Sequence, residues 1–229
     1  MTLSEAWEAH ASDWITWVRK PGHDSYDRYH RDQFLPLVRA PGRGTLDVGC
    51  GEGRLTRHLA SLGHRVVGID ASPSLVAAAR ELAPEMELHV ANAAALPFDD
   101  ASFDLVVSFM CLHDVDDLDG AVREIARVLE PGGVACLAVV HPLNSAGRFE
   151  KHGRFVIRGS YLESFRYSDT VQRGELAMTF ESQHRPISAY FDAFAAAGFV
   201  VDALREPATP GHDSWRRLPL FLHLRVQRI

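Results

Sequence analysis

Leu46-Asp-Val-Gly-Cys-Gly-Glu-Gly-Arg54 is the stretch that decides the fold. A short apolar strand runs into three glycines spaced by one residue, and a helical pattern follows. Such glycines permit a tight turn and let backbone N–H groups approach a ligand closely, while the helix N-terminus adds a positive dipole. Asp70 ends the next strand, 23 residues after Asp47, at the distance where an acid takes up ribose hydroxyls. The sequence therefore predicts a ribose-bearing ligand at this turn.

The spacing of the glycines separates two classes of ligand. A dinucleotide fold has the pattern G-x-G-x-x-G, whereas the pattern here is G-x-G-x-G and Arg54 stands where the third glycine would be. Asp47, two residues before the first glycine, would repel a pyrophosphate and attract an amino group. We therefore expect a ligand that is positively charged near the loop. A nicotinamide-dependent oxidoreductase is the less favoured alternative.

Segments with strand and helix character alternate around this stretch. The expected strands are 45–48, 65–69, 86–90, 103–108 and 135–140, and the expected helices are 54–62, 73–82 and 118–129. This alternation is typical of right-handed β-α-β units around a parallel sheet, which binds ligands beyond the carboxyl ends of its strands. Residues 141–184 show no regular pattern and are rich in aromatic residues. A helix at 187–197 then precedes two apolar runs, 199–204 and 218–226, which could pair as a hairpin.

These segments predict one domain over residues 1–229. Residues 1–42 are expected to form an N-terminal helical arm, and residues 43–140 the cofactor-binding core. Residues 141–184 would be a substrate or lid insertion after the fifth strand, and residues 185–229 a C-terminal helix and strands that complete the sheet.

Composition and charge exclude several classes of protein. A chain of 229 residues with 46% hydrophobic residues can bury a core, so it is not disordered. The longest apolar run, Val134–Val140, is far too short to span a membrane, and the first residues lack the pattern of a secretory signal. We therefore expect a cytoplasmic protein without a membrane partner. A net charge of −6 argues against nucleic acid as a partner.

Two residue types in the sequence, cysteine and aspartate, could bind a metal ion. The three cysteines lie far apart and lack ligand spacing, so we expect reduced thiols and no structural zinc. Acids gather at Asp114, Asp116, Asp117 and Asp119, directly before an expected helix. A metal site is one interpretation of these acids, but stabilisation of the helix dipole is the simpler one. We therefore expect no metal.

Several motifs in sequence order resemble the class I S-adenosylmethionine-dependent methyltransferases, of the broad small-molecule group often labelled type 11. The resemblance covers roughly residues 26 to 204. It rests on the glycine stretch, Val67-Gly-Ile-Asp-Ala-Ser72, Ala91-Asn-Ala-Ala-Ala-Leu-Pro-Phe98, Phe103-Asp-Leu-Val-Val-Ser108 and Arg127-Val-Leu-Glu-Pro-Gly-Gly133. The resemblance implies a Rossmann-like α/β fold with a seven-stranded, mostly parallel sheet, whose last strand is antiparallel and whose faces both carry helices.

The resemblance also implies S-adenosylmethionine as the cofactor and assigns residues to it. Asp70 would bind the ribose hydroxyls and Asp47 the amino group, directly or through water. The other residues expected at the cofactor are Tyr29 from the arm, Gly49, Cys50 and Gly51 at the methionine part, Ala71, Asn92 and Ala93 at the adenine, and Phe109, with Met110, at the sulfonium. Asn92 departs from the aspartate usual in the family, yet its amide carbonyl can still meet the adenine amino group.

Methyl transfer requires in-line attack, and an acceptor that carries a proton must lose it. Histidine suits this task near neutral pH, and His113, His141 and His184 follow segments that end at the expected active face. Each could equally be a structural histidine. The aromatic residues of the arm and the insertion could form a lid over an organic substrate or ordinary packing; they are Trp14, Trp17, Tyr26, Tyr29, Tyr161 and Tyr167.

The sequence thus favours a methyltransferase that acts on O or N, more than C, of a small, partly aromatic or apolar metabolite, as a monomer or homodimer. A nucleic-acid methyltransferase is a weaker alternative, because Ser108-Phe-Met-Cys111 stands where an Asn/Asp-Pro-Pro-aromatic tetrad is frequent. A non-catalytic S-adenosylmethionine-binding protein also remains open.

Overall fold

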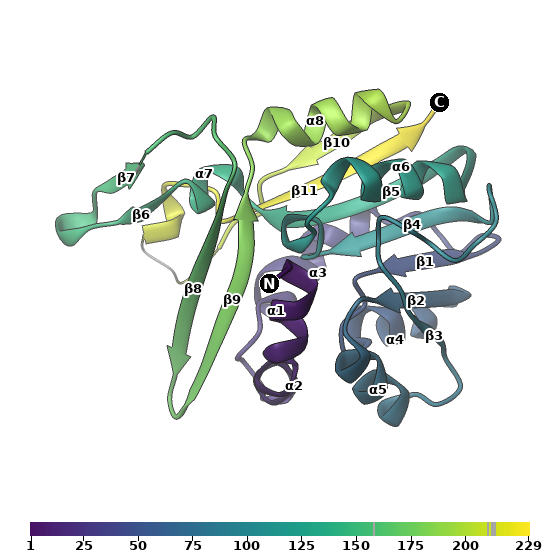
Figure 1. The fold of residues 1–229 in the computed structure, drawn as a ribbon, viewed down its shortest axis with the longest axis horizontal. Helices are drawn as coiled ribbons and strands as arrows, with labels where there is room; N and C mark the ends of the chain where they lie inside the picture. Colours follow the sequence, from purple (N-terminus) through teal and green to yellow (C-terminus); the bar gives the residue numbers. More distant parts are fainter. Residues whose placement is uncertain (158, 210, 212–213) are drawn as a thin grey trace.

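The computed structural model describes residues 1–157, 159–209, 211 and 214–229. Its centre is a seven-stranded sheet of order β10-β11-β5-β4-β1-β2-β3 (Figure 1). All neighbours pair in parallel except β11, which runs antiparallel to both β5 and β10. The strands are β1 (Thr45–Val48), β2 (Val66–Asp70), β3 (Glu87–Val90), β4 (Phe103–Phe109), β5 (Leu129–Val140), β10 (Phe199–Arg205) and β11 (Phe221–Arg228). The predicted fold class and the predicted pairing of the last two strands are confirmed.

The strand order reverses beside β1. The chain adds β2 and β3 on one side of β1 and then crosses to β4 and β5 on the other side. The carboxyl ends of β1 and β4 therefore flank the topological switch point, where open α/β sheets bind ligands. The glycine stretch leaves β1 at this place.

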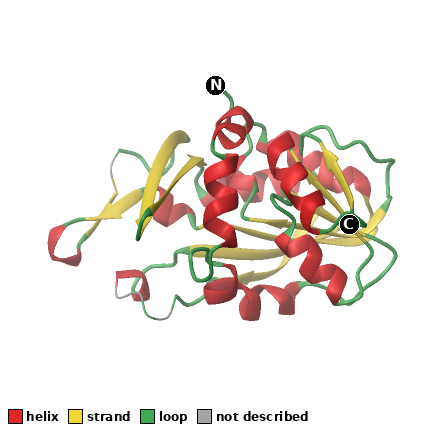
Figure 2. Cartoon of the chain, turned by 90° about the horizontal axis from the view of Figure 1, so that it is seen from below, coloured by secondary structure: helices red, strands yellow, loops and turns green. Residues whose placement is uncertain are grey.

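Helices cover both faces of the sheet (Figure 2). One face carries α4 (Arg54–Ser61) and α5 (Pro73–Leu82), and the other carries α6 (Leu118–Val128) and α8 (Ile187–Ala196). Local chemistry fixes where two of these helices begin. The Ser72 hydroxyl accepts from the Leu75 amide before α5, and Asp117 accepts from the Gly120 amide before α6.

The N-terminal arm is helical; its first two helices contact α5, and its later turns pack on one face of the sheet. Its elements are α1 (Leu3–Ala9), α2 (Ala11–Arg19), the π-helical turn η1 (Tyr26–His30), α3 (Arg31–Phe34) and the 3-10 turn η2 (Leu35–Leu37). Glu8 of α1 ties the arm to the start of α5, because its carboxylate accepts from the hydroxyls of Ser72 and Ser74. The arm also contacts β9 (Leu176–His184) of the insertion.

The insertion after β5 is not irregular, contrary to the sequence prediction. It contains α7 (Pro142–Ser145), β6 (Gly147–Phe149), the 3-10 turn η4 (Lys151–Gly153), β7 (Phe155–Ile157), β8 (Phe165–Arg173) and β9 (Leu176–His184). β8 and β9 form a long antiparallel hairpin beside the arm (Figure 1). Gly174, with φ of 61°, supplies the left-handed conformation that the short turn needs. Two further 3-10 turns are η3 (Leu112–Asp114) and η5 (Ser214–Arg216).

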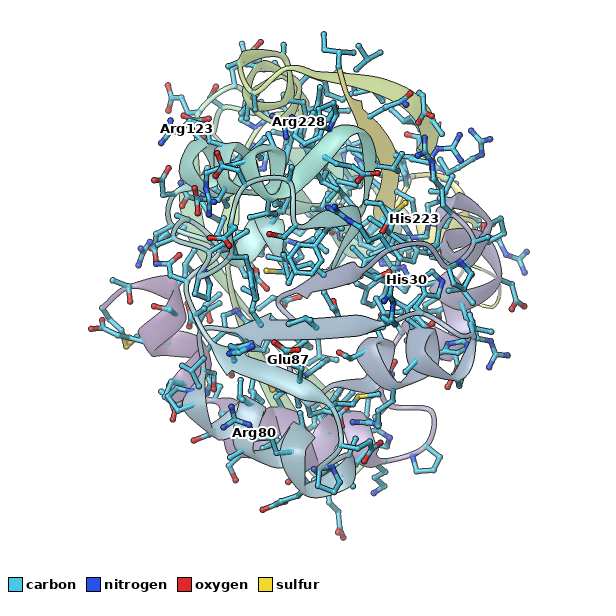
Figure 3. All side chains as sticks on the ribbon, turned by 90° about the vertical axis from the view of Figure 1, so that its right-hand side faces the viewer. His30, Arg80, Glu87, Arg123, His223 and Arg228 are labelled. Atoms are coloured by element: carbon cyan, nitrogen blue, oxygen red, sulfur yellow. The ribbon has the colours of Figure 1, made fainter. Side chains whose placement is uncertain are left out.

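One polar pair lies in the core between the arm and the sheet. Nδ1 of His30 and Nε2 of His223 are 2.8 Å apart, and both side chains are fully buried (Figure 3). Burial lowers the pKa of His223 to about 4 and that of His30 well below its usual range. Both rings are therefore neutral near pH 7.

Within the described residues, no helix is long and apolar enough to cross a bilayer.

Candidate active site

The glycine turn after β1 has backbone conformations that favour glycine. Gly49, Gly51 and Gly53 have φ values of 77°, 56° and 80°. The amides of Gly49 and Cys50 both donate to the carbonyl of Ile69, at 2.8 and 2.9 Å, and tie the turn to β2. A Cβ at Gly49 would lie 2.4 Å from Cβ of Cys111. The first glycine is therefore required both by its conformation and by the close approach of the chain that leaves β4.

Asp70, at the carboxyl end of β2, faces this turn. Its Oδ2 accepts from the Gly51 amide at 2.8 Å, and its Oδ1 accepts from the Ser72 amide at 2.9 Å. Each carboxylate oxygen can accept a further hydrogen bond, so the group can take two hydroxyls while it keeps both amides. Burial raises the pKa of Asp70, and the two amides oppose that rise. The arrangement is suited to a ribose.

Asp47 lies beneath the turn and is 1% exposed. Thr56 of α4 donates its hydroxyl to Oδ2 of Asp47 at 2.7 Å. Burial raises the pKa of Asp47 to about 7, the hydroxyl of Thr56 opposes the rise, and the charge of Asp70 adds to it. A cationic group beside Asp47 would therefore favour its ionised form.

The remaining residues expected at the cofactor divide into two groups. Ala71, Asn92, Ala93 and Phe109 line the same cavity as the glycine turn. Oδ1 of Asn92 accepts from the Ala94 amide at 2.8 Å, which fixes the side chain within its own loop. Tyr29 is not in the cavity wall; it is 5% exposed and packs against Phe221, with ring centroids 6.3 Å apart. Its expected contact with the cofactor is not supported by its position.

Met110 marks the end of β4 with an uncommon backbone. It has φ of 54°, and its amide donates to the carbonyl of Ala138 at 2.8 Å. This left-handed residue turns the chain so that Cys111 packs against Gly49. Met110 and Phe109 both line the cavity. Backbone strain of this kind concentrates at functional sites.

A continuous cavity of about 980 Å³ extends from the glycine turn to the β8–β9 hairpin. This volume lies at the upper end of the range for small-molecule sites, so it has room for a cofactor and a second molecule. The far side of the cavity is aromatic. Trp7 and Trp14 of the arm and Phe180 of β9 contact one another edge to face, with centroids 5.9 to 6.3 Å apart.

His113 is the one predicted catalytic histidine that lines the cavity. It lies in η3, and its Nε2 is 3.5 Å from Oδ1 of Asp114. Burial, followed by the charge of Arg185, lowers the pKa of His113 to about 3. The ring is therefore neutral but a weak base. It is a poor group to receive a proton from an acceptor.

His141 and His184 do not line the cavity, in contrast to the sequence prediction. Nδ1 of His141 accepts from the Leu143 amide at 3.0 Å and caps α7, while its Nε2 lies 3.2 Å from Glu206. Nδ1 of His184 is 2.7 Å from Oγ of Ser145, and its Nε2 is 2.9 Å from the carbonyl of Tyr161. In both residues the ring nitrogens already have structural partners.

Sequence reasoning missed a polar group at the far side of the cavity. Asp114, treated only as one of a run of acids, lines the cavity with a side chain that is 9% exposed. Ser182 of β9 donates its hydroxyl to Oδ1 of Asp114 at 2.6 Å, and Tyr167 pairs with Ser182 across the hairpin. Burial raises the pKa of Asp114 well above its ordinary value, which Ser182 and the charge of Arg185 oppose. The alternation of polar and apolar residues along 165–184 was the sequence signal that could have indicated the strands of this hairpin.

The other acids of this run have separate structural partners. Asp117 caps α6, and Asp116 accepts from the Leu3 amide and pairs with Arg166. Among the described residues, no three His, Cys, Asp or Glu side chains form a group that could hold a metal ion.

The sheet order, the glycine turn at the switch point and the acid at the end of β2 define the class I S-adenosylmethionine-dependent methyltransferases. Residues 46–137 of the chain match the family described as "Methyltransferase domain". The cofactor of this class is S-adenosylmethionine. The residues present fit it, because Gly49 and Gly51 line the cavity without side chains and Asp70 retains acceptor capacity for a ribose.

Known proteins of several organisms are similar to the chain. An uncharacterized methyltransferase of Synechocystis sp. is 36% identical over 117 residues, which cover 50% of this chain and 55% of that protein. A probable S-adenosylmethionine-dependent methyltransferase of Mycolicibacterium smegmatis is 41% identical over 108 residues, which cover 47% and 42%. The match thus spans about half the length of these curated relatives.

A solved structure extends the likeness in fold. An S-adenosylmethionine-dependent methyltransferase from Mesorhizobium loti superposes with a TM-score of 0.71 at 24% identity, over 86% of this chain and 96% of that one.

Proposed function

We propose that the protein transfers a methyl group from S-adenosylmethionine to an oxygen or nitrogen, less readily a carbon, of a small, partly aromatic or apolar molecule. The observation that carries this proposal is the continuity of the cavity. One space of about 980 Å³ includes the glycine turn, Asp70, Asp114 and the aromatic side chains Trp14 and Phe180. A protein that only stored the cofactor would not need the second half of this space.

Each part of the chain has a defined task in this proposal. The backbone of Gly49, Cys50 and Gly51 holds the methionine part, Asp47 supports the amino group, and Asp70 binds the ribose hydroxyls. Ala71, Asn92 and Ala93 contact the adenine, and Phe109 borders the reacting centre. The bound cofactor supplies an electrophilic methyl group on a sulfonium.

The arm and the hairpin exclude water and align the acceptor for in-line attack, which accounts for most of the acceleration expected of such an enzyme. The insertion therefore decides which acceptor fits. We further propose a cytoplasmic protein, monomeric or homodimeric, without nucleic acid as a substrate, on the basis of its net charge of −6.

Calorimetry with S-adenosylhomocysteine and with NADH tests the cofactor. S-adenosylhomocysteine should bind at least tenfold more tightly. Tighter binding of NADH would refute the proposal in favour of an oxidoreductase. Transfer of a labelled methyl group to any small molecule would exclude a purely sensory role.

A further inference from the structure

Asp114 is one of the acids of the cavity wall without an arginine or lysine ion pair among the described residues, and unlike Asp47 and Asp70 it has no task at the cofactor. Asp24, Glu52 and Asp116 each pair with an arginine. The Asp114 carboxylate has no lysine or arginine within ion-pair distance in the described part of the chain. Its Oδ1 lies 3.5 Å from Nε2 of the neutral His113 ring, and the charge of Arg185 acts on it from farther away. A buried carboxylate without a cation in direct contact is costly, so a cationic ligand beside Asp114 would stabilise its ionised form.

The surroundings of Asp114 keep it in place. Arg185 donates to the carbonyls of Leu112 and Val115, at 3.4 and 2.5 Å, and so fixes the turn η3 that carries the acid. Ser182 and His113 both approach the same oxygen, Oδ1. Neither of these contacts uses Oδ2. The Trp7 side chain also acts on the carboxylate as a donor, and because a carboxylate has about four acceptor sites, one remains for a ligand.

Aromatic rings adjoin this acid. Phe180 and Ser182 are two residues apart on β9, so they lie on the same face of the hairpin. Trp7 contacts Phe180, and its indole N–H lies close enough to Asp114 to lower the pKa of that carboxyl. A carboxylate next to indole and phenyl rings is a favourable environment for an ammonium group attached to an apolar body.

We propose that the methyl acceptor is a primary or secondary amine with an aromatic or apolar body, and that Asp114 binds its nitrogen and receives its proton. This inference rests on the proposed function. A phenol or alcohol would also donate to Asp114, but it would not bring a positive charge into contact with the carboxylate. A carboxylic acid as acceptor would place a second negative charge beside the Asp114 carboxylate.

The proton must leave before attack. The acceptor ammonium transfers one proton to the Asp114 carboxylate, which becomes a neutral acid, and the nitrogen recovers its lone pair. That pair forms the N–C bond while the C–S bond breaks, and sulfur keeps the electrons of the broken bond. The product is a methylated ammonium and a neutral thioether. The raised pKa of Asp114 suits it to hold the proton during this step.

Matched probes test the proposal without knowledge of the natural acceptor. The protein is saturated with S-adenosylhomocysteine, and binding of 2-phenylethylamine, 2-phenylethanol and phenylacetate is measured by calorimetry. The amine should bind at least tenfold more tightly than the other two. Asp114→Asn should weaken amine binding at least tenfold and leave alcohol binding unchanged. Asp119→Asn, an exposed acid in the first turn of α6, is the control and should have no effect.

The outcomes separate this inference from the proposed function. Failure of wild-type protein to bind S-adenosylhomocysteine would contradict the proposed function itself. If S-adenosylhomocysteine binds normally, then amine binding that survives Asp114→Asn, tighter binding of the alcohol or the acid, or no binding of any probe would each overturn only the assignment of an amine. Thermal melting and S-adenosylhomocysteine affinity of Asp114→Asn serve as checks on folding, and both should match the wild type.

Discussion

Replacement of Asp70 by alanine should weaken cofactor binding by a predictable amount. In the structure each oxygen of the carboxylate already accepts one backbone amide, from Gly51 and from Ser72, and can accept one ribose hydroxyl in addition. A hydrogen bond to a charged group contributes roughly 1.5 to 3 kcal/mol. Because water can replace part of what is lost in this open cavity, Asp70→Ala should cost about 2 kcal/mol in S-adenosylhomocysteine affinity, or roughly a 30-fold rise in Kd.

Isothermal titration calorimetry measures this change directly, with circular dichroism as a check on folding. Asp99→Ala is the matched control, because Asp99 is an exposed acid outside the cavity wall. Its Kd should stay within twofold of the wild type. A folded Asp70→Ala protein whose Kd changes less than threefold would refute the assignment of Asp70 to the ribose. An equal loss in Asp99→Ala would show that charge alone, rather than position, controls affinity.

Three further predictions concern the turn, the core and the arm. Gly49→Ala should cost about 2 kcal/mol of stability and most S-adenosylhomocysteine binding, since φ is 77° and the new Cβ meets Cys111; Cys111→Gly in the same chain should restore part of both in melting and calorimetry. Below pH 6.5 the unfolded chain protonates His223, whereas the folded chain does not until about pH 4, so urea unfolding should show a loss of about 3 kcal/mol between pH 7 and pH 4. His30→Phe with His223→Leu should reduce that loss, and an unchanged pH dependence would exclude the pair as its source. Glu8→Gln removes the carboxylate that accepts from two serine hydroxyls at the start of α5, so trypsin should cleave the arm several-fold faster; an unchanged rate would contradict its role as a tether.

The sheet and its ligand turn were predictable because their signals are local. The expected strand 45–48 and helix 73–82 match β1 and α5 in both bounds. Thr45–Val48 is a short segment with apolar residues at positions 46 and 48, and Ser72 and Pro73 give a helix start that depends on neighbouring residues only. Asp70 was identified because it ends the next strand, 23 residues after Asp47, and the structure places it against the Gly51 amide.

The far half of the cavity was not predictable in the same way. Whether a histidine near the active face is available depends on contacts between distant segments, such as that of His184 with Ser145 and Tyr161. Asp114 faces the cavity because Ser182, 68 residues later, lies over it in the hairpin. The residue pattern of one short segment cannot predict either contact, because each joins segments that are far apart in the sequence. The hairpin itself was missed because its strands are only partly buried and their alternation of polar and apolar residues is weak.

A crystal structure with S-adenosylhomocysteine is the most direct test of the central claim. The ribose hydroxyls should lie within hydrogen-bond distance of Asp70, and the amino acid part should lie over Gly49 and Gly51. The sulfur should face the far side of the cavity, where Asp114 and Phe180 lie. A ligand bound elsewhere, or with its sulfur turned away from the far side of the cavity, would contradict the proposed methyl transfer.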